Sequence, residues 1–209
     1  MMLDKMLPWL GRVTPRETGE PNLGVAVARQ VDRYLRLGFH KELRMDGVAY
    51  LRRFRLPEGV SQPEAYAGRF DIPLVVDPGV ELSRQAALAG IRVWKNVDIG
   101  LVEDLTGVHR GPYLVFTNDG QRHRPYPIGV AMSLFEADEI GSPLAEVVAL
   151  YVQHPECFEE SGVYAAGSRY QGEYVPRLGQ ASIDAGWIRE EWGGKSVLSR
   201  GREIVRLGA

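Results

Sequence analysis

SPLAEVVALYVQHP, residues 142–155, carries the clearest structural signal in the chain. Apolar residues recur in it at the spacing of one face of an α-helix; they are Leu144, Val147, Val148, Tyr151 and Val152. Ser142 is a favourable N-cap, Pro143 suits the first helical position because its missing N–H would be unpaired there, and Pro155 ends the pattern. These features predict a helix over about 142–154 at the centre of the core.

Two more helices are predicted closer to the N-terminus. A 3.6-residue apolar repeat predicts one over about 22–37. Gly38 follows it, and glycine readily adopts the left-handed conformation that ends helices. Asp46 is a good N-cap for the second helix, which Pro57 is expected to end.

The middle of the chain predicts strands. IPLVVD, residues 72–77, is a short apolar run of strand-forming residues. A helical segment over 81–90 and the strand-like IRVWK over 91–95 follow it, which indicates a local parallel strand–helix–strand unit.

A β-hairpin is predicted around Asp119-Gly120, a pair that favours two-residue turns. Residues 114–116 would form its first strand and residues 121–126 its return strand, with Arg122 and Arg124 on one face and His123 on the other. From Val163 onward, frequent Gly, Tyr and Trp predict several short strands packed against the 142–154 helix.

The expected fold is therefore α+β: a single domain with N-terminal helices, followed by a mixed sheet packed on the central helix. A chain of 209 residues is long enough for one well-cored domain. We place this domain over 22–209. Residues 1–21 form an arm with an apolar streak, and the sequence leaves open whether the arm packs on its own domain or on a partner subunit.

The composition indicates in which cellular compartment the protein is expected. The single cysteine, Cys157, has no internal disulfide partner, and a free thiol suits a reducing environment. The N-terminus mixes Asp4 and Lys5 into its apolar residues and makes a poor signal peptide. No run of eighteen apolar residues occurs, so we expect no membrane association and a cytoplasmic location.

Charge is distributed unevenly although the net charge is only −2. Residues 29–55 contain eight Lys or Arg against three Asp or Glu, whereas residues 136–173 contain one against eight. The two regions either face each other, lie on separate solvated surfaces, or include a basic face that contacts nucleic acid or an acidic protein.

GSRYQGEYVP, residues 167–176, raises the question of a phosphate-binding loop. Gly167 and Gly172 have the spacing of such a loop, but Glu173 stands where a lysine is required and would repel phosphate. GGKS, residues 193–196, has the lysine and serine but lacks the first glycine. We therefore expect no nucleotide cofactor, and the Arg169 side chain in this segment is expected to contact an acidic group.

No metal site is expected either, because the four histidines are scattered and lack ligand spacing. His154 and Cys157 are three residues apart, which would suit an activated thiol if the helix continued, although Pro155 interrupts it. A weak enzyme hypothesis places a catalytic site around His154, Arg169 and Tyr170, with Cys157 as a further candidate.

Basic residues beside aromatic ones supply a nucleic-acid hypothesis, because arginine contacts phosphates and aromatic rings stack on bases. The candidate residues fall into two short segments and are Arg52, Arg53, Arg55, Arg122, His123 and Arg124. A solvated face around core aromatics explains the same pattern.

Three segments, in order, resemble a family of uncharacterised bacterial proteins, a domain of unknown function. They are GPYLVFTNDG (111–120), SPLAEVVALYVQHPE (142–156) and GSRYQGEYVPRL (167–178), and the resemblance covers about residues 90–202. The family often ends in Gly-Ser-Ala-Ser-Cys-Gly-Arg, whereas this chain has GGKSVLSRGRE and lacks that cysteine. The resemblance implies a shared fold and transfers no activity.

Because no catalytic constellation is evident, the leading hypothesis is a non-catalytic binding or structural module. It would act through protein–protein contacts, in a homo-oligomer or a larger assembly. Nucleic-acid association and an enzyme site around Arg169 and His154 are the alternatives.

Overall fold

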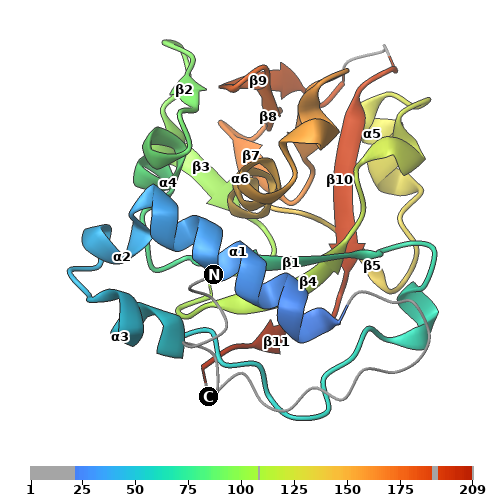
Figure 1. Ribbon diagram of the computed structural model, residues 1–209. Coiled ribbons are helices and arrows are strands. Elements are labelled where there is room, and N and C mark those ends of the chain that lie inside the picture. The colour runs from blue at the N-terminus through green and yellow to red at the C-terminus, as the bar shows by residue number, and fades with distance from the viewer. Residues whose placement is uncertain (1–21, 108, 190–192, 209) are drawn as a thin grey trace.

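The chain has an α+β fold, in which α-helices pack on a mixed sheet of eleven strands (Figure 1). The computed structural model describes residues 22–107, 109–189 and 193–208, so the expected arm over 1–21 lies outside the described residues. The helices are α1 (Leu23–Leu37), α2 (Phe39–Glu42), α3 (Gly47–Arg52), α4 (Leu82–Leu88), α5 (Ile128–Ser133) and α6 (Leu144–Gln153). Within the described part of the chain, no helix combines the length and the apolar character needed to cross a membrane.

Gly38 ends α1 and Asp46 caps α3 as expected, while the cap at Asn22 and the end of α3 were not predicted. The Asn22 side chain accepts hydrogen bonds from the first backbone N–H groups of α1, and Gly38 ends the helix with a φ of 90°. Asp46 caps α3 by accepting a hydrogen bond from the Ala49 N–H at 2.8 Å. α3 ends at Arg52, before Pro57 is reached.

The eleven-stranded sheet consists of two parts, called the two sheets below, that share one strand. They are β1 (Ile72–Val76), β2 (Arg92–Val93), β3 (Val102–Asp104), β4 (Tyr113–Thr117), β5 (Glu139–Gly141), β6 (Val163–Ala165), β7 (Ser168–Tyr170), β8 (Tyr174–Gly179), β9 (Ser182–Trp187), β10 (Ser196–Gly201) and β11 (Val205–Arg206). The first half of β10 pairs in parallel with β6, and its second half pairs antiparallel with β5 and β4. Figure 1 shows β10 running nearly at right angles to β1 and joining the two sheets. Every residue of β10 is buried.

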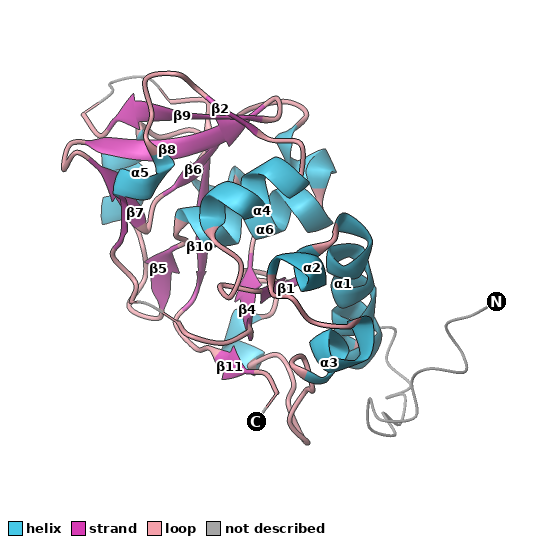
Figure 2. Ribbon diagram, turned by 90° about the vertical axis from the view of Figure 1, so that its left-hand side faces the viewer, coloured by secondary structure: helices cyan, strands magenta, loops and turns pink. Residues whose placement is uncertain are grey.

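α6 lies in the centre of the molecule, where the sequence predicts a core helix. Eight of its ten residues are buried, and it packs against β1, β6 and β8. Figure 2 shows it between the β8–β9 layer and β1 with α1. The expected N-cap differs: Pro143 occupies the N-cap position, and the Leu144 N–H donates to the Ser168 Oγ at 2.9 Å. A hydroxyl from β7, distant in sequence, replaces the local cap that Ser142 was expected to provide.

Both faces of the β1–β4 pair are covered, which explains its continuous apolar sequence. Leu74 and Val115 belong to the core around α6, whereas Val75 and Leu114 belong to a second core under α1 and α3. Alternate residues of β6 and β10 point to opposite faces of the sheet. α6 covers one of these faces, and α5 covers the other, where a third core forms.

Two expected pairings do not form. The strand–helix–strand unit is wrong, because β1 pairs antiparallel with β4 while β2 pairs in parallel with β9. The return strand of the hairpin is also wrong, since Gln121–His123 form a 3₁₀ turn after Gly120, whose φ is 79°. The Val197 N–H of β10 donates to the Gly120 carbonyl at 3.0 Å, so a strand from the end of the chain takes the place of the expected return strand.

Candidate functional site

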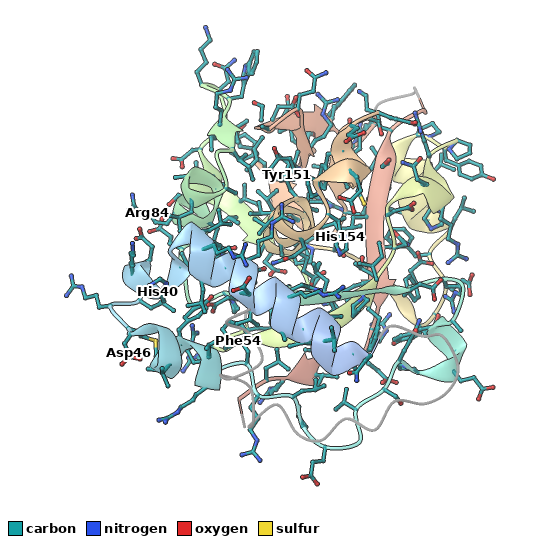
Figure 3. The ribbon with its side chains drawn as sticks, in the orientation of Figure 1. His40, Asp46, Phe54, Arg84, Tyr151 and His154 are labelled. Carbon is teal, nitrogen blue, oxygen red and sulfur yellow. The ribbon has the colours of Figure 1, made fainter. Side chains whose placement is uncertain are left out.

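The four candidate catalytic residues do not converge. His154 follows the last residue of α6, beyond Tyr151 (Figure 3), and its Nδ1 is 3.1 Å from the Glu156 Oε1. Arg169 lies on β7 beside Ser168, which contacts the first residue of α6. The ten residues of α6 therefore separate His154 from Arg169, and a helix of that length spans about 15 Å.

Arg169 contacts no carboxylate among the described residues, contrary to the expected acidic partner. Its guanidinium donates to the carbonyl oxygens of Ala166 and Ser168 at 3.1 and 2.7 Å, and it lies 3.8 Å from the sulfur of Met132. Burial lowers its pKa. The Tyr170 hydroxyl donates to the Asn96 carbonyl at 3.2 Å, which fixes the loop after β2.

Cys157 has the environment of an unreactive thiol. It is half-buried in the 3₁₀ turn Pro155–Phe158. Burial, the largest cause, and the negative charges of Glu156 and Asp119 together raise its pKa to about 11. The His154 side chain is paired with Glu156, so it does not serve as a base for the thiol.

We predict slow alkylation of Cys157 in the native protein. A pKa raised from 9.0 to about 11 leaves roughly a hundredfold less thiolate at neutral pH, and the thiolate is the reacting species. The rate of iodoacetamide modification, followed by mass spectrometry, measures this. The same protein unfolded in urea is the control and should react much faster; equal rates in the two states would show that Cys157 is activated.

Among the candidate nucleic-acid residues Arg52, Arg53 and Arg55, one already has an acidic partner within the fold. Arg53 makes two hydrogen bonds to the buried carboxylate of Asp77, at 2.9 and 3.0 Å. The Tyr50 hydroxyl donates to the same carboxylate at 2.9 Å. Arg52 and Arg55 remain exposed. One of the three arginines is therefore a structural residue that fixes the end of α3 to the end of β1.

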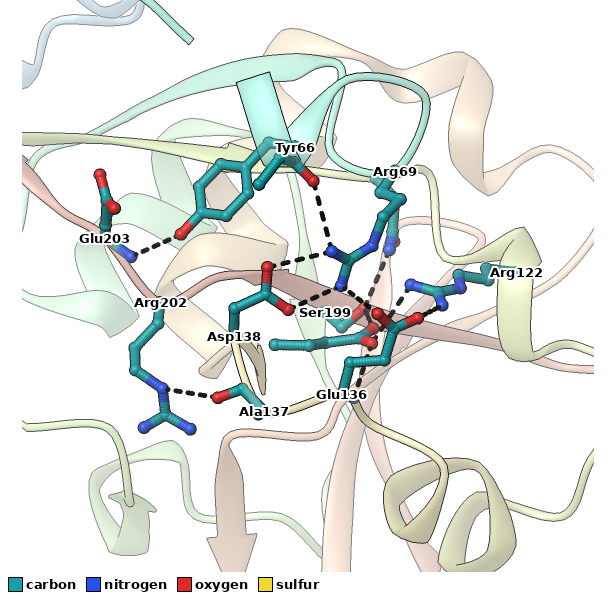
Figure 4. Close-up of polar contacts among 12 residues, drawn as sticks. Tyr66, Arg69, Arg122, Glu136, Ala137, Asp138, Ser199, Arg202 and Glu203 are labelled. Atoms are coloured by element: carbon teal, nitrogen blue, oxygen red, sulfur yellow. Dashed lines mark hydrogen bonds and ion pairs between the residues drawn. The ribbon is translucent and has the colours of Figure 1, made fainter. Parts of the chain in front are cut away.

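The two arginines of the other candidate segment, Arg122 and Arg124, also form ion pairs, and Figure 4 shows those of Arg122. Arg122 contacts Glu136 and, at 3.2 Å, Glu139. Arg124 contacts Glu160 at 2.9 Å. His123 is buried. The acidic stretch over 136–173 thus finds its partners in arginines outside the basic stretch over 29–55; they are Arg69, Arg122, Arg124 and Arg200.

Glu139 is the centre of this buried network. It accepts hydrogen bonds from the Ser199 hydroxyl at 2.5 Å and from the His123 Nε2 at 3.1 Å. Burial alone would raise its pKa, but these bonds and the charge of Arg122 outweigh burial and lower it. In a catalytic triad the histidine lies between the serine and the carboxylate. Here the carboxylate lies between the other two, so His123 is not placed to take the Ser199 proton, and we assign the network to structure.

A second buried ion pair joins β10 to α6. The Arg200 Nε lies 2.8 and 2.9 Å from the two carboxylate oxygens of Glu146, and both side chains have no solvent exposure. The Tyr113 hydroxyl donates to the same carboxylate at 3.2 Å. Neither Glu146 nor Arg200 was among the residues singled out by sequence, because each is a lone charge in an apolar segment.

A groove of about 680 Å³ runs beside β2 and the β8–β9 hairpin. Its walls carry both charge signs, from Arg92 and Lys95 on one side and Glu159 and Glu160 on the other. Trp94 lies beside them and is half exposed. The mixed charges do not favour one class of ligand.

The surface of α5 is apolar and uncovered. Tyr126, Val130 and Leu134 are spaced four residues apart and are 44%, 45% and 45% exposed. We call these three residues the α5 surface. Residues 125–135 contain no charged side chain. The arrangement offers an area for protein contact and no group suited to catalysis.

The described geometry thus consists of structural polar networks in the interior, a mixed-charge groove and an uncharged apolar surface. Comparisons with models of protein families, with curated proteins and with solved structures find no match to this chain.

Proposed function

We propose that this protein is a binding or structural module that acts through protein contacts, and that it self-associates through the α5 surface. The observation that carries the proposal is the group of three exposed apolar side chains at α5: Val130 lies in the helix, Tyr126 shortly before it and Leu134 directly after it. Val130 and Leu134, at the end of the helix, are four residues apart and therefore lie on one side of it, while Tyr126 lies in the turn that leads into the helix. An exposed apolar face of this kind is typical of interaction sites.

The inner face of α5 supports this reading. Ile128 and Ala131 are buried against β6, β8 and β10, so the helix has already covered the core. A surface helix of a monomer usually places polar residues on its outer face. The outer face of α5 is apolar instead, which is costly unless a partner covers it.

A second copy of this chain is the proposed partner. Residues 125–135 are uncharged, so two copies can meet around a twofold axis without like-charge repulsion. Tyr174 and Trp187, paired across β8 and β9, are also exposed. The backbone of Ile188, which follows Trp187, lies close to Gly129 of α5, so we propose that these two aromatic residues extend the contact. Such an extension is needed, since a stable interface covers about 800 Å² on each partner.

We predict that Val130→Asp converts a dimer into a monomer. The substitution places a carboxylate in the middle of the contact, opposite its own copy, and a desolvated like-charge pair costs several kcal/mol. Sedimentation velocity over a range of concentrations measures the mass in solution. Val48→Asp is the matched control, since Val48 on α3 is 51% exposed and lies outside the α5 surface.

The expected result is a dimer for the unmodified protein and for the Val48→Asp variant. A strict monomer at all concentrations would contradict the proposal. A dimer that survives Val130→Asp would place the contact on another surface, and the arm over 1–21 would then be the next segment to delete.

The alternatives have less support. The nucleic-acid hypothesis retains the exposed Arg52 and Arg55, while Arg53, Arg122 and Arg124 already have acidic partners. A cytoplasmic location is proposed from the free thiol of the single cysteine, and the resemblance to a bacterial family of unknown function remains a proposal that adds no activity.

A further inference from the structure

A second candidate site lies where the chain enters β4 and β11 pairs with it. A cavity of about 390 Å³ is lined by the side chains of His109, Arg110, Tyr113 and Arg206, with Gly111 and Gly208 in its walls. We call it the His109 cavity. Its volume is within the range of sites for small molecules.

The walls of the His109 cavity are held by backbone pairing. β11 pairs with β4 so that Arg206 lies opposite Tyr113. The Leu207 N–H donates to the Pro112 carbonyl at 3.0 Å, and the Gly208 N–H donates to the Arg55 carbonyl at 2.9 Å. These bonds fix the segment that carries Arg206 against the segment that carries His109.

The lining is positively charged. Two arginines and a histidine line the cavity, and none of its described lining residues carries a carboxylate. The Arg110 and Arg206 side chains are exposed and have no ion-pair partner among the described residues. Cationic side chains gathered without an acidic partner favour an anion.

His109 contributes an unused polar atom. Its Nε2 is buried and has no hydrogen-bond partner among the described residues. The imidazole stands 4.6 Å from the Tyr113 ring, centroid to centroid, and is held there by that contact. Buried polar atoms in proteins are normally paired, so an unpaired one beside a cavity indicates a ligand or an ordered water.

We propose that the His109 cavity binds a small oxyanion, the phosphate or carboxylate group of a small molecule. Arg110 and Arg206 would pair with the anion, and the His109 Nε2, which is buried in this structure, would hydrogen-bond to it once the imidazole turns towards the cavity. The cavity is larger than a phosphate ion, and the buried Tyr113 ring at its base offers an apolar surface for the remainder of the molecule.

The charges that face His109 determine the pH dependence. Burial lowers its pKa, the cations Arg200 on β10 and Arg206 on β11 lower it further, and Asp104 on β3 opposes them. Arg110, its neighbour in the chain, also lines the cavity. A bound anion would favour the protonated imidazole and raise this pKa. By linkage the anion therefore binds more tightly as pH falls through the pKa of His109.

The test is an NMR titration of the folded protein at low ionic strength, following the imidazole Cε1–H signals. Inorganic phosphate is one probe and malonate the other, which separates phosphate from carboxylate recognition. We expect a saturable shift of the His109 signal and a raised His109 pKa in the bound state. The Arg206→Gln variant should bind the probe about tenfold more weakly, because it loses one charge-assisted contact.

Arg52→Gln is the matched control, because Arg52 is an exposed arginine on α3 that does not line the cavity. Binding by this variant should be unchanged. The proposal is overturned if neither probe shifts His109 saturably, or if Arg52→Gln weakens binding as much as Arg206→Gln, which would indicate general charge screening.

Discussion

An Arg200→Met variant is expected to lose about 3–5 kcal/mol of its free energy of unfolding, the usual cost of removing one partner of a buried ion pair. The loss arises because Glu146 stays buried with no solvent exposure and keeps only the Tyr113 hydroxyl as a close donor from β4. Chemical denaturation in urea, followed by circular dichroism, measures the change.

The double variant Arg200→Met, Glu146→Leu tests the cause. Replacing both charges by apolar groups removes the unpaired carboxylate, so most of the lost stability should return. Arg84→Met is the matched control for the arginine, since Arg84 pairs with Glu42 at 2.8 Å on the surface and should matter little. A single variant as stable as the Arg84→Met control would mean that the buried pair does not hold α6 to β10.

Gly167→Ala is expected to cost about 3 kcal/mol, at the upper end of the range for overpacking a rigid core. A Cβ at this position would overlap the Gly141 carbonyl oxygen and would lie 2.8 Å from both the Pro143 nitrogen and the Thr106 Cγ2. The first two neighbours are backbone atoms, at the end of β5 and at the N-cap of α6, and have little room to move. Thermal or urea unfolding provides the measurement.

Substitutions of two other glycines serve as controls for this prediction. Gly111→Ala should be nearly neutral, because nothing lies within 4 Å of the added Cβ. Gly172→Ala meets no atom either, but its φ of 74° makes alanine strained, by about 1–2 kcal/mol. If Gly167→Ala were no worse than Gly172→Ala, close packing would not be the reason for glycine at 167.

The same comparison explains the two glycines of GSRYQGEYVP. Gly167 permits a close approach of β7 to the start of α6, and Gly172 forms the turn between β7 and β8. The spacing that resembles a phosphate loop therefore has two separate structural causes.

The helices could be predicted from the sequence because their signals are local. Asn22, Gly38 and Asp46 act within a few residues of their own position. Strand pairing could not be predicted, because the partners of β4 come from β1, β10 and β11, which are distant in the chain. Nothing within residues 112–126 signals that β10 would exclude a return strand.

The ion-pair partners of the candidate site residues could not be predicted for a related reason. In the sequence Arg53 and Arg122 look like free surface arginines, whereas their carboxylates lie 24 and 17 residues away, in Asp77 and Glu139. Conversely, Arg200 lies in an apolar strand, and its partner Glu146 is 54 residues away. Only the placement of that pair in space shows that both charges are buried.

The sharing of β10 has a consequence for how the protein is made. Residues 196–201 pair with β6 in one sheet and with β4 and β5 in the other, and they follow all of these strands in the chain. During synthesis neither sheet is complete until this segment has left the ribosome. The earlier strands therefore keep unpaired edges until β10 joins them, and the same segment pairs with both sheets.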